Sequence, residues 1–158
     1  RRAPETRIVN NTIRGSLEGI RMGLSHRGEY HDSVDIAKRL VIAGNSLELL
    51  LSIMASRERF GIFIGNCESA LVEDNYITVK RYPLTQKLTF EGVRIFGHLG
   101  RMLLVSQNHT EGVSVGVRLS SLSSLNHQKQ WLVKDNLFFA AENAVSAAGG
   151  VRSSNNIT

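Results

Sequence analysis

Short segments in which apolar and other residues alternate recur along the whole chain. One kind begins at a glycine in four copies and at an alanine in a fifth, and it places apolar residues one and three positions later: Gly19–Met22, Gly61–Ile64, Gly92–Ile95, Gly116–Leu119 and Ala144–Ala147. Alternation with a period of two is typical of a β-strand that buries one face. The pattern therefore predicts five short strands of one kind.

A second kind of segment is centred on an asparagine and alternates with the first. In five copies a β-branched residue precedes the asparagine by three positions, and the residue two positions after it is apolar in four copies and Thr110 in the other. These copies are centred on Asn11, Asn45, Asn75, Asn108 and Asn136, and residues 152–157 form a degraded sixth copy. A repeat of this length predicts a solenoid, whose coils stack along one axis.

Most of these strands are not separated by a helical segment, so an ordinary sheet with crossover helices is disfavoured. Parallel strands stacked coil on coil, about 4.8 Å apart, satisfy the pattern instead. An asparagine at a sharp turn tolerates left-handed backbone angles, and its amide can donate and accept along the stack. The sequence predicts an all-β parallel β-helix of about five coils with an internal asparagine ladder, in one domain over residues 1–158.

The pattern Gly-Ile-x-Ile followed by Ile-x-x-Asn-x-Ile resembles the parallel β-helix repeat of the pectate-lyase-like superfamily, which has the pectin-lyase fold. The resemblance covers Thr6 to Ile157. It implies right-handed winding, with the glycine segment as the first strand of a coil (PB1), the residues before asparagine as the second (PB2) and those after it as the third (PB3). It also implies saccharide binding in a groove over PB1, and it favours an extracellular or cell-surface location.

Several coils are longer than the minimum. The polar stretch 24–38 follows the first PB1 strand and contains His26, Glu29, His31, Asp32 and Asp35. We expect this loop to be solvated rather than to bind a metal, because a zinc site needs about three or four well-spaced ligands on firm supports. Two further insertions lie between PB3 and PB1, and the second is basic, with Lys80, Arg81 and Lys87. No cofactor is expected.

The outward positions of the PB1 strands form a row when the coils are stacked. This arginine row consists of Arg21, Phe63, Arg94, Arg118 and Ser146. Adjacent arginines repel unless an anion lies across them, and arginine binds carboxylate or sulfate in a bidentate way. Together with Lys80, Arg81 and Lys87 the row predicts a groove for an anionic ligand. The alternative is a solvated face whose charge is screened by Glu18 and Glu91.

The outward positions of the PB2 strands form a second row, which is apolar. This aliphatic row consists of Val41, Leu71, Leu104 and Leu132, and Arg7 precedes it. An aligned apolar row predicts a covered face, by a partner chain, by self-association or by the leucine-rich insertion 46–60. The alternative is that exposed aliphatic side chains are ordinary.

A catalytic site is not evident, and catalytic residues remain unknown. The PB1 strands lack aspartate, and Glu18 and Glu91 do not form the carboxylate pair of a glycosidase. Arg94 or Arg118 could be the base of a lyase, but no acidic calcium cluster stands beside them. Cys67 is expected to be a small residue in a turn rather than a nucleophile, because no histidine is placed to activate it.

The amino-acid composition limits the kinds of partner that the chain is expected to bind. Apolar residues make up 42% of the chain and charged residues 21%, as in a soluble folded protein, and the net charge of +5 weakly favours an acidic partner. The basic residues lack an aromatic platform for nucleic acid, and no apolar stretch approaches the roughly 20 residues of a membrane span. The single cysteine excludes an intrachain disulfide, and no signal peptide is visible.

These observations predict a non-catalytic β-helix module. It would bind an anionic polysaccharide or act as a rod in a larger surface or secreted protein. The alternative is a polysaccharide lyase or glycoside hydrolase with catalytic residues partly outside these residues. Because solenoid ends need caps and none is seen, the chain is expected to be an excised domain or a subunit that stacks end to end. The ligand, the oligomeric state and the compartment are left open.

Overall fold

A computed structural model describes residues 5–22, 38–51, 59–81, 88–121, 130–139, 142–147 and 151–158. Within these residues every regular element is a β-strand. The strands are β1 (Thr6–Val9), β2 (Thr12–Ser16), β3 (Ile20–Met22), β4 (Leu40–Ala43), β5 (Ser46–Leu51), β6 (Phe60–Glu73), β7 (Tyr76–Arg81), β8 (Glu91–Ser106), β9 (His109–Glu111), β10 (Val115–Ser121), β11 (Gln130–Lys134), β12 (Leu137–Phe139), β13 (Asn143–Ala147) and β14 (Val151–Ser154).

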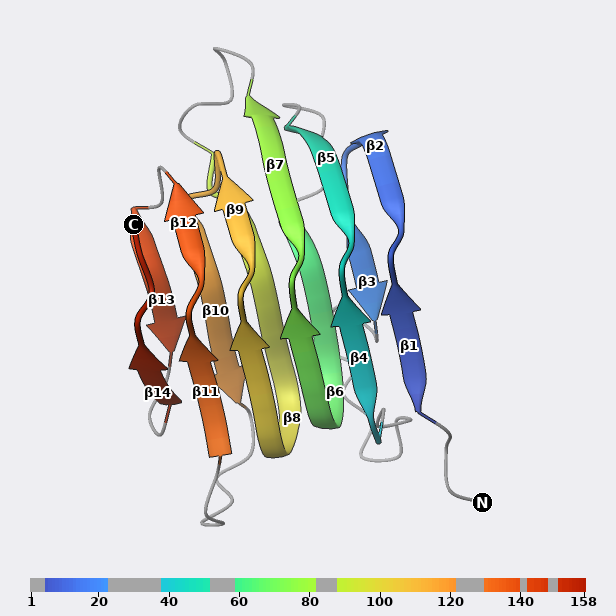
Figure 1. The fold of residues 1–158 in the computed structure, drawn as a ribbon, viewed down its shortest axis with the longest axis vertical. Coiled ribbons are helices and arrows are strands. Elements are labelled where there is room, and N and C mark those ends of the chain that lie inside the picture. The colour runs from blue at the N-terminus through green and yellow to red at the C-terminus, as the bar shows by residue number, and fades with distance from the viewer. Residues whose placement is uncertain are drawn as a thin grey trace.

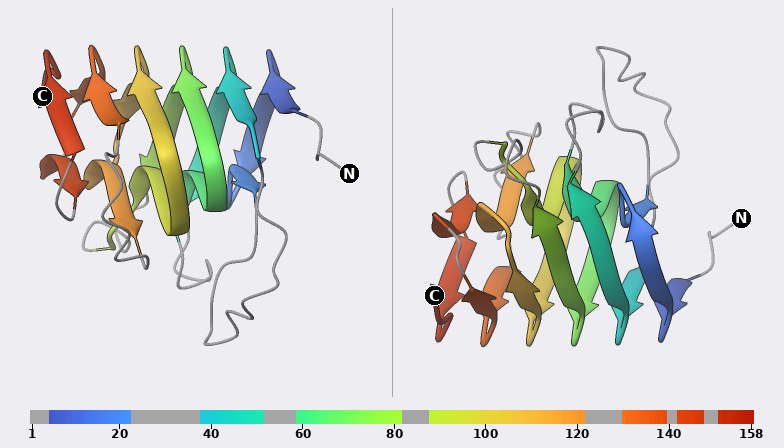
Figure 2. Two further views of the ribbon diagram at one scale, coloured as in Figure 1. Left: turned by 90° about the horizontal axis from the view of Figure 1, so that it is seen from below. Right: turned by 90° about the horizontal axis from the view of Figure 1, so that it is seen from above.

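The strands form two parallel sheets that face each other across one core (Figure 1, Figure 2). The nine-stranded sheet contains β1, β4, β6, β8, β10 and β13 in that order; in addition, β3 pairs with β6, β11 pairs with β8, and β14 pairs with β11. The five-stranded sheet has the order β12-β9-β7-β5-β2. Each strand pairs with strands one coil away, as the repeat predicts. The described part is a β-solenoid of about three turns.

Two long strands join segments that the sequence predicts as separate. β6 and β8 each contain a PB1 segment and the following PB2 segment, so both kinds belong to one sheet. Their mutual register shifts between Gly65 and Cys67 and again between Cys67 and Ser69. Asn66 and Gly97 have positive φ angles of 42° and 117° there. The two strands therefore bend at a register irregularity and stay paired on both sides of it. The alternation of apolar residues does not predict such a bend.

The inward side chains fill the solenoid with aliphatic residues. Leu47, Leu49 and Leu51 of β5 are fully buried. They lie on the inner face of the five-stranded sheet, so the expectation that insertion 46–60 covers the aliphatic row is wrong for its described first part. The reason is that this insertion begins as a regular PB3 strand, whose alternate residues point into the core. Residues 52–58 lie outside the described residues.

The asparagine ladder is present. Each side-chain nitrogen donates to the side-chain oxygen of the asparagine in the next coil, at distances of 3.0, 2.9, 2.9, 3.0 and 2.8 Å. The rungs join Asn11, Asn45, Asn75, Asn108, Asn136 and Asn156. Asn156 thus belongs to the degraded sixth copy. The four central asparagines are each 1% exposed, and their amides also donate to backbone carbonyls. Each of these buried amides therefore has hydrogen-bond partners.

The left-handed backbone position lies one residue earlier than the sequence predicts. Positive φ angles occur at the residues directly before the ladder asparagines: Asn10, Gly44, Asp74, Gln107, Asp135 and Asn155. The ladder asparagines are absent from this set, so assigning them left-handed angles was wrong. The preceding residue turns the chain, and this turn aims the asparagine amide along the axis. Small or polar side chains at the turn position suit that conformation.

The glycines of the PB1 segments are required by a close approach between the sheets. A Cβ atom added to Gly92 would lie 2.6 Å from the carbonyl oxygen of Gly116 and 2.8 Å from Cγ2 of Thr110. Thr110 belongs to β9 on the opposite sheet, and it is fully buried. The glycine therefore leaves the space that the neighbouring strand and the opposite sheet need, and this explains why it opens four of the five PB1 segments.

Candidate functional site: the arginine row

The arginine row is aligned as predicted. Arg21 pairs in register with Phe63, Phe63 with Arg94, Arg94 with Arg118, and Arg118 with Ser146. The arginine side chains on β3, β8 and β10 are 31%, 23% and 37% exposed. Arg94 and Arg118 lie directly opposite each other on neighbouring parallel strands, where two like charges need a counter-ion.

That counter-ion is a carboxylate of the chain itself. Oε1 of Glu91 lies 2.8 Å from Nε of Arg118, and Oε2 lies 3.6 Å from Nε of Arg94. The Glu91 side chain is 9% exposed, so it is almost fully withdrawn from water between the two arginines. Nε of Arg94 and Nε of Arg118 are shielded from solvent yet lack hydrogen-bonding geometry to any described residue. The ion pairs therefore offset part of the positive charge and leave the two Nε donors without a hydrogen bond.

The N-terminal part of the row is covered by its own side chains. The Arg21 guanidinium lies 4.7 Å from the ring centroid of Phe60 and 5.6 Å from that of Phe63, and it pairs with Glu18 at 3.3 Å. The two rings are 5.0 Å apart and fully buried. Placing Phe63 on an open groove surface was therefore wrong, because its ring is packed beneath a guanidinium and against a second ring.

Lys80, one of the basic residues expected around the groove, lies elsewhere. Lys80 lies on β7 in the five-stranded sheet, where its ammonium bonds to Glu48 of β5. This hydrogen bond, together with the charge of Lys80, lowers the pKa of Glu48. Grouping Lys80 with the arginine row was wrong, since the two lie on different sheets. Lys87 lies outside the described residues.

Arg81 has a structural role at the end of β7. Its Nε donates to the carbonyl of Gly112 at 2.6 Å, Nη1 to the carbonyl of Leu88 at 3.0 Å, and Nη2 to Oγ of Ser114 at 2.9 Å. Burial lowers the pKa of Arg81. Because three of its donors bind the connection between neighbouring coils, Arg81 is better placed to hold that connection than to bind a free ligand.

The structure bears differently on the candidate metal site and on Cys67. The described residues contain no group of three metal-ligating side chains, and residues 24–37 of the polar loop, with His26 and His31, lie outside them. Cys67 lies within the bent strand β6 and is fully buried, and burial raises its pKa to about 12. A thiol with such a pKa stays protonated near neutral pH and is a poor nucleophile.

The aliphatic row is aligned and half-buried. Val41 pairs with Leu71, Leu71 with Leu104, and Leu104 with Leu132. The register continues to Arg7 at one end and to Arg152 at the other, so cationic side chains bound the apolar row. All four apolar side chains have intermediate exposure. The row therefore remains a candidate contact surface, and the described residues do not show what would cover it.

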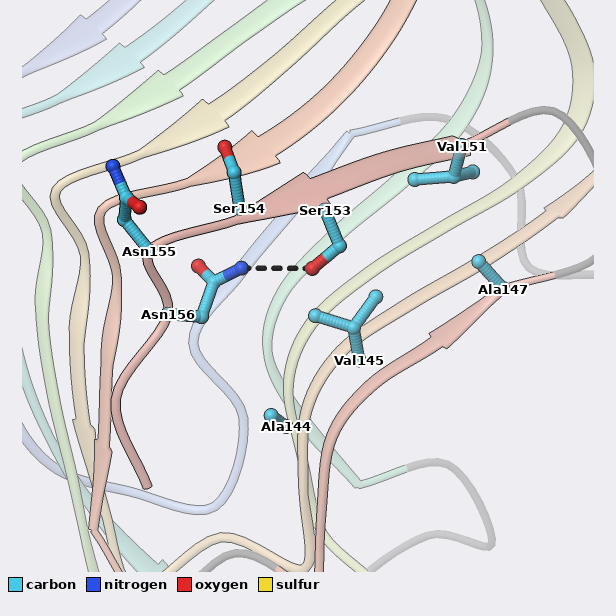
Figure 3. A pocket seen from close by; sticks show the side chains of 8 residues that line it. All are labelled: Ala144, Val145, Ala147, Val151, Ser153, Ser154, Asn155 and Asn156. Atoms are coloured by element: carbon cyan, nitrogen blue, oxygen red, sulfur yellow. Dashed lines mark hydrogen bonds between the residues drawn. The ribbon is translucent and has the colours of Figure 1, made fainter.

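A cavity of about 550 Å³ opens between β13 and β14 (Figure 3). Its walls are Ala144, Val145, Ala147, Val151, Ser153, Ser154, Asn155 and Asn156. Nδ2 of Asn156 donates to Oγ of Ser153 at 2.9 Å inside it. Small and uncharged side chains line this cavity, so its walls carry no ionisable group.

Sequence reasoning missed one exposed feature, on the five-stranded sheet. Tyr76, His109 and Phe139 stack their rings one against the next in tilted pairs, and we call them the aromatic row. A signal for two of them was present, because Tyr76 and His109 each directly follow a ladder asparagine and must point outward together. Phe139 follows Asn136 by three residues, so the repeat alone did not join it to the others.

Comparison with protein-family models, with curated proteins and with solved structures found no match to this chain. Among the described residues, no helix has the length and apolar character needed to cross a membrane. The functional argument therefore rests on the geometry of the surface rows.

Proposed function

We propose that this chain is a non-catalytic β-helix module that binds an acidic polysaccharide along the arginine row. The proposal includes right-handed winding, five coils over the whole chain, the pectate-lyase-like repeat and an extracellular or cell-surface location. Its support from the sequence is the repeat of glycine and asparagine segments. Its support from the fold is the parallel solenoid with a buried asparagine ladder.

One observation carries the binding proposal. Arg94 and Arg118 occupy the same register position on adjacent strands and share the single carboxylate of Glu91. Among the described residues, Arg21 pairs with Glu18, so the row holds three guanidiniums and two carboxylates. A ligand carboxylate or sulfate can compete with Glu91 and form bidentate contacts with the guanidiniums.

The same geometry favours binding over catalysis. Both carboxylate oxygens of Glu91 are engaged by arginines, whereas a general acid needs a carboxyl group that can reach the leaving group. Glu18 is engaged by Arg21. The alternative is a lyase or glycoside hydrolase with catalytic residues partly outside these residues. A lyase would use an arginine as the base, and each of these guanidiniums already has a carboxylate partner.

The experiment compares two double charge reversals. Arg94→Glu with Arg118→Glu removes the site, whereas Arg14→Glu with Arg152→Glu changes the net charge equally at exposed positions elsewhere. Retention on polygalacturonate, alginate and a sulfated glycan is measured by affinity electrophoresis. We expect the first pair to weaken retention about tenfold or more, equivalent to about 1.4 kcal/mol, and the second to change it about twofold or less.

Two results would contradict the proposal. Equal losses in both variants would mean that net charge alone attracts the glycan, without a site. Release of shortened or unsaturated products from any of the three polymers by the wild-type chain would favour the enzymatic alternative. Both measurements use the 158-residue chain, with circular dichroism to show that each variant is folded.

A second candidate function is self-association through the aliphatic row. The observation that favours it is the register alignment of four half-buried aliphatic side chains between two arginines. An aligned apolar row is a better contact surface than the same residues scattered would be.

A further inference from the structure

The aromatic row is part of a wider apolar patch on the five-stranded sheet. Leu137 lies in register with His109 and is bridged to Ile157, so Tyr76, His109, Leu137 and Ile157 form one outward line across four successive coils. Phe139 lies two residues after Leu137 on the same face of β12. We call these five residues the aromatic patch. Tyr76 is 44%, Phe139 45% and Ile157 63% exposed, so the patch is a candidate contact surface.

The rings of the patch hold one another in place. The centroids of Tyr76 and His109 are 4.5 Å apart, and those of His109 and Phe139 are 5.1 Å apart. Because His109 is packed between the other two rings, the three side chains are fixed before any partner binds. Side chains that are already ordered lose little rotamer freedom on association, which favours binding.

Carboxylates border the aromatic patch. Asp74 lies at the exposed turn that leads into β7, and Glu111 is in register with Phe139. Both are exposed, and neither has an ion pair among the residues that the structure describes. Lys80, further along β7, already pairs with Glu48. The patch is therefore an apolar surface with an acidic border.

The aliphatic row on the nine-stranded sheet has the opposite charge at its ends. Its register continues to Arg7 and Arg152, which are both exposed. Arg7 pairs with Glu5 at 3.2 Å, whereas Arg152 has no ion pair within the described residues. Glu73 and Lys134, in the next outward row, carry one charge of each sign. The row, like the patch, extends along four successive coils, about 14 Å at the usual strand spacing.

We propose that the aromatic patch of one copy of the chain docks on the aliphatic row of a second copy. This inference rests on the second candidate function, self-association through the aliphatic row, and it names the surface that the row contacts. Both surfaces repeat at the strand spacing, so the side chains of one can pack between those of the other along four coils. The same docking brings an end arginine of the row toward the carboxylates that border the patch.

Charge disfavours contacts between like surfaces. Two aliphatic rows that face each other place the end arginines, Arg7 and Arg152, against the end arginines of the other copy, whether the rows run parallel or antiparallel. Two aromatic patches bring the free carboxylates of Asp74 and Glu111 toward each other. The patch and the row lie on different sheets that face each other across the core, so they cannot meet within one chain. The contact is therefore heterologous, and each dimer keeps one patch and one row free to extend the assembly.

The experiment mixes two variants that each lose one surface, and it follows mass by sedimentation equilibrium over a concentration series. Leu71→Asp with Leu104→Asp removes the row, and Tyr76→Ser with Phe139→Ser removes the patch. We expect the wild type to associate and each variant alone to associate about tenfold more weakly or worse. Their equimolar mixture should form a 1:1 dimer, because each variant supplies one intact surface. Leu17→Ser, at an exposed leucine outside both surfaces, should behave as the wild type does.

A second comparison tests the charges. Asp74→Asn with Glu111→Gln removes the acidic border and should weaken association about threefold or more. Glu68→Gln with Glu142→Gln makes the same change in net charge at exposed positions elsewhere and should leave association unchanged. Circular dichroism shows that each variant is folded. Equal effects of the two pairs would overturn the pairing of the acidic border with the arginines.

The outcomes separate this inference from the second candidate function. If the variant without the row is monomeric but the variant without the patch associates as the wild type does, rows contact rows, so this inference fails and the candidate function stands. If the variant without the row still associates, both fail. A wild-type chain that is monomeric throughout the series also refutes both. A mixture that stays monomeric, although each variant alone is monomeric and folded, refutes the docking of patch on row.

Discussion

Nδ2 of Asn75 donates a hydrogen bond of 2.9 Å to Oδ1 of Asn108, although the two residues are 33 positions apart in the chain. The same Asn75 amide also donates to the carbonyls of Ile42 and Glu73. Its oxygen accepts from both the backbone nitrogen and the side-chain nitrogen of Asn45. One side chain thus makes five hydrogen bonds that join three successive coils.

The first prediction concerns this rung. Asn75→Ala leaves the donors of Asn45 and several carbonyls unsatisfied inside the solenoid, and we expect a loss of about 3 kcal/mol or more in the free energy of unfolding. Asn11→Ala makes the same chemical change at an exposed position and should cost about 1 kcal/mol or less. Urea unfolding of both variants measures the difference, and equal costs would show that the buried ladder is not a main source of stability.

The second prediction concerns Glu91. Glu91→Gln removes the internal competitor for Arg94 and Arg118, so retention on polygalacturonate should rise about threefold or more. The free energy of unfolding should fall by about 1 to 3 kcal/mol, because two guanidiniums lose the negative charge that pairs with them at a buried position. Glu48→Gln is the matched control, since Glu48 pairs with Lys80 on the other sheet and should leave retention unchanged. Unchanged or weaker retention in Glu91→Gln would refute the displacement of Glu91 by ligand.

The third prediction concerns the glycine that approaches both a neighbouring strand and the opposite sheet. Gly92→Ala places a Cβ atom within 2.8 Å of both the Gly116 carbonyl and Thr110, so the neighbouring strand and the opposite sheet must both shift to admit it. We expect a cost of about 1 to 3 kcal/mol in unfolding free energy. Gly92→Ala combined with Thr110→Ser, which removes the contacted methyl group, should recover part of this loss. If chemical denaturation finds no recovery, the clash is with the backbone alone.

The fourth prediction concerns pH. Burial raises the pKa of Cys67 from an ordinary 9.0 to about 12, so the unfolded chain loses this proton at lower pH than the folded chain does. Stability from the protonated thiol is complete below pH 9 and is lost progressively as pH rises from about 9 to about 12. The difference in unfolding free energy between the wild type and Cys67→Ala should therefore shrink from pH 8 to pH 10. A thiol reagent should also react with the native protein much more slowly than with the unfolded chain.

The fifth prediction concerns the aliphatic row. If this row is a self-association surface, Leu71→Asp with Leu104→Asp converts a dimer or trimer to a monomer in light scattering, because it buries two charges at the contact. Leu17→Asp, at an exposed leucine outside the row, should leave the mass unchanged. A wild-type chain that is already monomeric at high concentration would rule out self-association through this face.

The sequence alone was sufficient for the ladder and for the two predicted rows. Asparagine at the same place in every repeat, with a β-branched residue three positions earlier, defines both the register and the inward face. Once Asn75 and Asn108 are aligned, Leu71 must lie beside Leu104, and once Gly92 and Gly116 are aligned, Arg94 must lie beside Arg118. A period of two then decides which side chains point outward, and no tertiary information is needed for that step.

The tertiary structure decided which of those outward residues are accessible and what each one binds. Glu91 bridges two arginines, Phe63 is covered by Arg21, and Lys80 pairs with Glu48 on the other sheet. None of these contacts follows from alternation, because each depends on how long side chains lean across neighbouring coils. Repeat spacing determines where a Cα atom lies along the stack, whereas the ends of Arg, Glu and Phe side chains settle only after packing and charge pairing compete in three dimensions.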